Sequence, residues 1–178
     1  LADQCSIASA SLALEILDAA NRFAEAGKQP FKVVIASADG CPVASPTGQT
    51  LQVDAALAEI KRTDLVVIPG FLFSLREALP ALAQYAPWLR QQHAQGAFIA
   101  AMCTASFMLA EAGLLDGMPA TTHWAFADFF RRRYPQGHAV RSDPALYDFV
   151  DALRQRHLRH APRLAKVVYD GQLQRAAQ

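Results

Sequence analysis

Short, continuously apolar runs alternate along this chain with longer stretches of helical periodicity. The apolar runs predict buried strands at 31–36, 65–68 and 97–102. Apolar residues spaced three or four positions apart predict helices at 11–26, 54–62, 75–92, 104–112 and 125–134. Strands that are apolar throughout and separated by helices indicate a parallel sheet covered on both faces. We therefore expect one doubly wound α/β domain over residues 1–178.

Glycine and proline residues predict where these elements stop. Asp39–Gly40 and Pro46–Gly48 are typical of turns. Gly27 is suited to end the helix at 11–26, because glycine accepts the left-handed conformation of a helix C-terminus. Pro80 and Pro87 are expected to kink or break the helix at 75–92, since proline lacks the amide hydrogen.

Open parallel sheets bind ligands at the carboxyl ends of their strands, which places the candidate site just after Ile68 and Met102. Cys103 lies there, at the predicted strand-to-helix junction, with Ala101 and Ala105 two positions to either side. Small residues at these positions let the strand and helix pass closely, as a cysteine nucleophile elbow requires. A helix N-terminus would also favour the thiolate. A buried cysteine acting as a small apolar residue explains the pattern equally well.

His123 is the second candidate, in the short extended piece predicted at 121–123. It could act as a base or ion-pair partner for a thiolate, or equally as a structural histidine bonded to backbone. The other histidines lie in polar stretches and are expected to be solvated: His93, His138, His157 and His160.

The composition excludes several classes of protein to which this chain could belong. Of the 178 residues 52% are hydrophobic and 19% charged, a globular balance, and the net charge of +1 lacks the basic excess of a stand-alone nucleic-acid binder. Cys5, Cys41 and Cys103 form no CxxC pair, which argues against a disulfide framework or zinc site and for the cytoplasm. The sequence contains no nucleotide or zinc-protease motif and no apolar run of membrane length, and this stretch shows no secretory signal. We therefore expect no cofactor, metal or membrane contact.

The run Met102–Gly117, followed by Ala120–Trp124, resembles the DJ-1/PfpI superfamily. Within it, the sequence is most similar to the amidotransferase-like domains fused to AraC-type helix-turn-helix domains. Leu14–Asn21 and Asp64–Gly70 add to the resemblance, which covers most of residues 5–135. It implies a flavodoxin-like fold with Cys103 at the elbow. It also implies that Thr104 offers a backbone N–H to an oxyanion-type site and that His123 approaches the pocket.

Three positions depart from the catalytic members of the superfamily. Ser9 stands where they carry an acid, six positions before Glu15. Phe71 follows Gly70 where a second glycine would help build an oxyanion hole, and Ala105 replaces the usual glycine after Cys-Thr. We therefore expect ligand binding rather than efficient catalysis, through Ser9, Gly70, Phe71, Cys103, Thr104 and His123. The apolar loop 71–73 suits a pocket wall or a dimer contact.

The resemblance implies the ligand-sensing domain of an AraC-type transcription regulator. Its expected partners are a small-molecule effector, a second copy in a homodimer, and DNA through a separate C-terminal domain absent from this chain. A cysteine-dependent hydrolase or isocyanide-hydratase-like enzyme, in which Cys103 attacks carbon with help from His123, is the alternative, and a redox sensor is another. Both ends look truncated: the first strand of the superfamily is expected before Leu1, and a further segment before Asp148.

Overall fold

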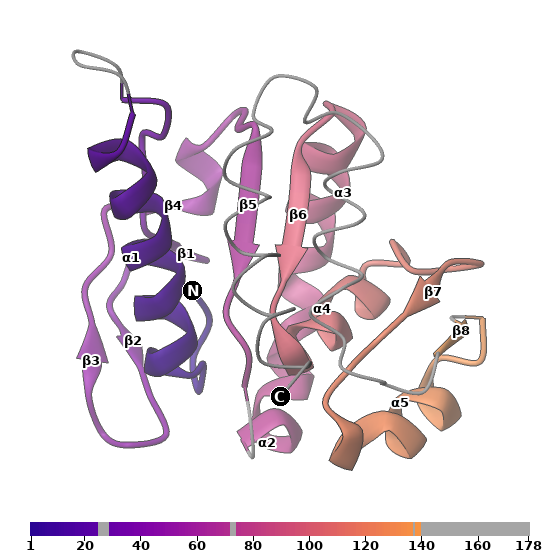
Figure 1. Ribbon diagram of the computed structural model, residues 1–178. Helices are drawn as coiled ribbons and strands as arrows, with labels where there is room; N and C mark the ends of the chain where they lie inside the picture. Colours follow the sequence, from indigo (N-terminus) through magenta and orange to yellow (C-terminus); the bar gives the residue numbers. More distant parts are fainter. Residues whose placement is uncertain (25–28, 72–73, 137, 140–178) are drawn as a thin grey trace, which may run out of the picture. The chain divides into compact units, whose positions relative to one another are not determined.

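The computed structural model describes residues 1–24, 29–71, 74–136 and 138–139, all within one compact unit, Leu1–Arg141. The first helix is followed by four short strands, and strands and helices alternate only after them (Figure 1). The helices are α1 (Ile7–Arg22), α2 (Leu75–Leu82), α3 (Ala86–Ala94), α4 (Ser106–Glu111) and α5 (Ala127–Arg133). The strands are β1 (Ala36–Ser37), β2 (Val43–Ala44), β3 (Thr50–Leu51), β4 (Ala55–Ala56), β5 (Leu65–Ile68), β6 (Phe98–Ala101), β7 (Pro119–Ala120) and β8 (His138–Ala139).

Strands β5 and β6 carry the candidate site and lie side by side, pointing the same way (Figure 1). They pair in parallel from Leu65 opposite Phe98 to Ile68 opposite Ala101. The pairs β1–β4 and β7–β8 are also parallel, whereas β2 and β3 form an antiparallel pair. The predicted strands at 65–68 and 97–102 and their parallel pairing are therefore confirmed.

Two expectations in the first half of the chain are wrong. The strand predicted at 31–36 reaches strand geometry only in β1, and the helix predicted at 54–62 is replaced by β4 and a 3₁₀ turn at Leu57–Glu59. Ala55–Ala56 forms a strand because it pairs with Ala36–Ser37. This contact with a distant segment outweighs the preference of alanine for a helix. No described strand pairs with residues 31–35, so they lack the ladder that defines a strand.

The helices agree with the predicted pattern but differ at their ends. Helix α1 begins a turn early because the hydroxyl of Ser6 accepts a hydrogen bond from the Ser9 amide, as an N-cap does. Its predicted stop at Gly27 lies outside the described residues. The helix predicted at 75–92 is broken just before Pro87, into α2, a 3₁₀ turn at Ala83–Tyr85, and α3, whereas Pro80 lies inside α2 and does not end it. Pro87 lies in the first turn of α3, where the missing amide costs little.

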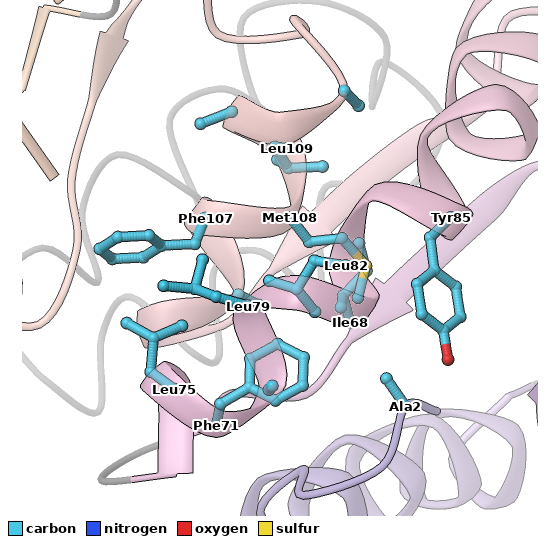
Figure 2. Packing of buried hydrophobic residues seen from close by; sticks show 14 of the residues in the cluster. Ala2, Ile68, Phe71, Leu75, Leu79, Leu82, Tyr85, Phe107, Met108 and Leu109 are labelled. Carbon is cyan, nitrogen blue, oxygen red and sulfur yellow. The ribbon is translucent and has the colours of Figure 1, made fainter. Parts of the chain in front are cut away.

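Helices α2 and α4 each contribute four buried side chains to the hydrophobic core, and α5 contributes Phe130. Figure 2 shows Phe71, Leu75 and Phe107 among the buried side chains of the core, and all three are fully buried. Phe107 stands edge-to-face with Phe130, their ring centroids 4.9 Å apart, and stacks on Phe129 at 5.6 Å. Such ring pairs add about 0.5–1.5 kcal/mol each beyond burial, so α4 is held firmly against α5.

Candidate functional site

Cys103 occupies a sharp strand-to-helix junction. It opens the 3₁₀ turn Cys103–Ala105 with a φ of +54°, a left-handed value that costs a non-glycine residue about 1–3 kcal/mol. The bond from the Met102 amide to the Ile68 carbonyl, at 2.9 Å, continues the β5–β6 ladder up to the turn. Ala105 is fully buried, as the predicted close passage of strand and helix requires.

The loop after β5 lies directly against this junction. A Cβ atom on Gly70 would come within 3.1 Å of the Met102 carbonyl oxygen and 3.3 Å of the Cys103 Cβ. Only a glycine fits so close an approach without displacement of the backbone. The structure thus brings the carboxyl ends of β5 and β6 together at the position that the sequence predicted.

The start of α1 holds the Gly70 loop through two serines. Ser9 Oγ accepts from the Gly70 amide at 3.1 Å and donates to the Ser6 carbonyl at 3.0 Å. In return, the Ser6 amide donates to the Gly70 carbonyl at 2.7 Å. The sequence singled out Ser9 but missed Ser6, although a serine directly before a helix is a recognisable N-cap signal.

Thr104 holds the next residue of the same loop. Its hydroxyl oxygen accepts from the Phe71 amide at 2.8 Å, and both residues are fully buried. The side chain of Phe71 lies in the hydrophobic core near Leu75 (Figure 2), which leaves it no surface for contact with a second copy. Both loop amides beside Cys103 are therefore bonded to hydroxyl groups of this chain.

The thiol of Cys103 is exposed, yet the protein around it reduces its solvation and raises its pKa. Hydrogen bonds from Thr104 act in the opposite direction but are the smaller effect. The bond from the Thr104 backbone N–H is the effect expected where a helical turn begins, but the loss of solvation outweighs it, so the net shift disfavours the thiolate. Burial also raises the pKa of Cys5, and the neighbouring Asp39 raises that of Cys41.

The side chain of His123 makes its hydrogen bond within its own turn. Its Nδ1 accepts from the Ala125 amide at 3.2 Å, so the ring proton is placed on Nε2. The ring lies 5.3 Å from that of Trp124, which is 76% exposed, and 6.0 Å from that of Phe126. No hydrogen bond joins His123 to Cys103 among the described residues, so their predicted proximity stays a prediction.

The other expected features are placed as follows. His93 is exposed as predicted, whereas the side chain of His138 and all of His157 and His160 lie outside the described part of the chain. Among the described residues, no cluster of three or more His, Cys, Asp or Glu side chains could hold a metal ion. No helix within the described ranges has the length and apolar character to span a membrane.

The curated proteins that resemble this chain in sequence include a transcriptional regulator and an enzyme. The chain is 40% identical over 124 residues to the HTH-type transcriptional regulator CdhR of Pseudomonas aeruginosa, a stretch that covers 70% of this chain and 35% of that protein. It is 36% identical over 92 residues to the isonitrile hydratase of Pseudomonas putida, covering 51% of this chain and 39% of the enzyme. The chain thus spans little more than a third of either relative.

The fold has solved counterparts. An AraC family transcriptional regulator from Pseudomonas putida superposes with a TM-score of 0.65 at 22% identity, over 95% of this chain and 94% of that one. The flavodoxin-like α/β class predicted from the sequence is confirmed by such neighbours. The sequence profile of the DJ-1/PfpI family matches residues 7–173, a range that includes α1, both site strands and the Cys103 junction. The chain belongs to the DJ-1/PfpI family.

Proposed function

We propose that this chain is the ligand-sensing domain of an AraC-type transcription regulator and that it is not an efficient enzyme. The absence of efficient catalysis is inferred from the bond between the Gly70 amide and Ser9 Oγ, which puts a neutral hydroxyl beside the Cys103 junction. The sensing role in a transcription regulator is supported by the 40% identity to a transcriptional regulator.

The contacts of Ser9 argue against catalysis. A catalytic base near the thiol typically contributes about 10²–10⁴ in rate. The Ser9 hydroxyl is not a base at neutral pH, and its proton is directed to the Ser6 carbonyl. The Gly70 and Phe71 amides, which could stabilise an oxyanion, already donate to Ser9 and Thr104. The raised pKa of the Cys103 thiol further reduces the fraction of nucleophilic thiolate.

The same geometry is suited to binding. The exposed Cys103 stands at the carboxyl ends of two parallel strands, where sheets of this class take their ligands. We propose that an effector contacts Cys103, Ser9 and His123. Thr104, Gly70 and Phe71, which were expected to contact the ligand, are buried, and we propose that they hold the loop beside it. The effector would regulate by binding one arrangement of the attached DNA-binding domains better than the other. This proposal includes a homodimer in the cytoplasm, with DNA bound through a separate C-terminal domain.

The test uses the full-length regulator and a library of small metabolites in a thermal-shift screen. A ligand that binds only the folded state raises its apparent stability by about 2.7 kcal/mol at a hundred times its Kd. We expect Cys103→Ser to weaken this shift and the operator response, while Cys41→Ser, a matched change at an exposed thiol, leaves both intact. A response that is equal in both variants would contradict the proposed site.

The alternative is an enzyme related to the isonitrile hydratase that the chain resembles. The left-handed φ of Cys103 favours it, because such strain is often found at a nucleophile. Turnover of a small alkyl isocyanide by the wild-type protein, lost in Cys103→Ser, with a kcat near the 1–10³ s⁻¹ that is roughly typical of enzymes, would refute the sensor-only proposal. Reversible oxidation of Cys103 by peroxide with a change in DNA affinity would instead support the redox sensor.

A further inference from the structure

Seven polar residues are buried in the described part of the chain. Six of them have a hydrogen-bond partner for the side chain within it: Ser6, Ser37, Ser45, Gln92, Thr104 and Ser106. The seventh, Thr122, is 7% exposed, and its Oγ1 has no partner among the described residues. An unpaired buried hydroxyl destabilises the arrangement that buries it, because it has given up its bonds to water.

Packing alone does not explain a threonine at position 122. Valine has nearly the same shape and buries no polar atom, so it would make the buried arrangement more stable. The Thr122 hydroxyl gains a partner when its segment moves and brings it to water or to a ligand. The threonine therefore points to a second arrangement of this segment, in which the hydroxyl is bonded.

The segment that contains Thr122 lies between two anchored elements. Strand β7 leads into it and helix α5 follows it (Figure 1). Strand β7 pairs in parallel with β8. Helix α5 packs on the ring of Phe107 through Phe129 and Phe130. Residues 121–126 are therefore fixed at both ends, as a segment that swings about two hinges must be.

Between these ends the segment has few contacts that hold it closed. The Ala125 amide donates to His123 Nδ1 at 3.2 Å, and the Phe126 amide donates to the His123 carbonyl at 2.9 Å. No residue of the 3₁₀ turn that follows is buried, and Trp124 is 76% exposed. Among the described residues, one ring contact joins the segment to another element, from Phe126 to Phe107 at 6.5 Å. Exposed hydrogen bonds and few buried contacts are typical of a unit that opens locally.

We infer that residues 121–126 form a flap that opens from the rest of the domain, and that the unpaired hydroxyl of Thr122 sets how often it opens. In the closed arrangement the hydroxyl has no partner, and in the open one it bonds to water or to a ligand. Its cost makes the open arrangement about five- to hundredfold more populated than a valine would. Opening also displaces His123 and so changes the site at which we propose that the effector binds. Only this last consequence rests on the proposed sensing function.

Hydrogen exchange in the full-length protein measures the opening directly, because exchange at the Ala125 and Phe126 amides requires the flap to open. We expect Thr122→Val to slow this exchange about five- to hundredfold, since valine removes the cost of the closed arrangement. Thr121→Val, the same change at the partly exposed neighbouring residue, is the matched control and should leave the exchange unchanged. Equal or faster exchange in Thr122→Val would overturn the inference, because the hydroxyl would then have a partner in the closed arrangement.

A thiol at position 122 tests the opening in a second way. Thr122→Cys places a sulfur atom in the same buried position, whereas the natural Cys5 is fully buried in the hydrophobic core. If the flap opens, iodoacetamide should label the new thiol at least about tenfold faster than Cys5 in the folded protein. Labelling as slow as that of Cys5 would show that the flap stays closed and would overturn the inference. Neither measurement needs an effector, so a failure of the proposed sensing function would leave both results as they stand.

Discussion

Replacing Thr104 with valine removes the hydroxyl that joins the two halves of the candidate site. Valine has nearly the shape of threonine but cannot accept the Phe71 amide, which Thr104 Oγ1 accepts at 2.8 Å. Both residues are fully buried, so water cannot replace the hydroxyl without opening the loop. A buried donor left without a partner costs about 1–3 kcal/mol. For a chain of this size each kcal/mol lowers the Tm by roughly 2–4 °C, which gives a loss of about 2–12 °C.

Urea unfolding followed by circular dichroism measures this change, with Thr104→Ser as the control because it keeps the hydroxyl and loses only a methyl group. The serine variant should lose less stability than the valine variant. A second readout is chemical: hydrogen bonds from Thr104 lower the pKa of Cys103, so the valine variant should be alkylated more slowly near pH 8. If Thr104→Val is as stable as wild type, the Phe71 bond does not hold the loop and our account of the site is wrong.

Three further outcomes are expected. Gly70→Ala should destabilise the protein by about 1–3 kcal/mol in urea, because its Cβ would lie 3.1 Å from a backbone carbonyl oxygen; an unchanged midpoint would show that the loop yields freely. Burial raises the pKa of Tyr85 to about 12, so the native state should lose stability as the pH rises from about 10, where unfolded tyrosine ionises, to about 12; Tyr85→Phe should flatten this slope, and identical slopes would contradict the assignment. Iodoacetamide with peptide mapping should modify Cys103 first, and faster labelling of the buried Cys5 or of Cys41 would count against its special position.

The strands at the site could be predicted from the sequence because strands inside a covered sheet consist of apolar residues. Leu65–Ile68 and Phe98–Ala101 are apolar at every position, which is typical of strands in a parallel sheet covered on both faces. The role of Ala105 was likewise predictable, since a close strand-to-helix passage excludes larger side chains. The parallel arrangement alone predicts a candidate site after Ile68 and Met102, which stays a prediction.

Residues 31–35 and 54–62 were misjudged for one physical reason. A strand is defined by its partner, and neither propensity nor periodicity reveals which segment pairs with which. Ala55–Ala56 has a composition that favours helix, and only its contact with Ala36–Ser37 makes it a strand. Residues 31–35 have the composition of a strand, but among the described residues they lack a partner strand.

The chemistry of the site was decided by the tertiary structure. The sequence identified Ser9 and Thr104 as site residues, but only the fold shows their hydroxyls bonded to the Gly70 and Phe71 amides. The fold likewise decided the net direction of the Cys103 pKa shift, because desolvation depends on everything packed around the sulfur, whereas the sequence reveals only its neighbours along the chain. Local pattern determines where a strand or a turn can form, and contacts between distant segments determine which of their polar groups remain free to react.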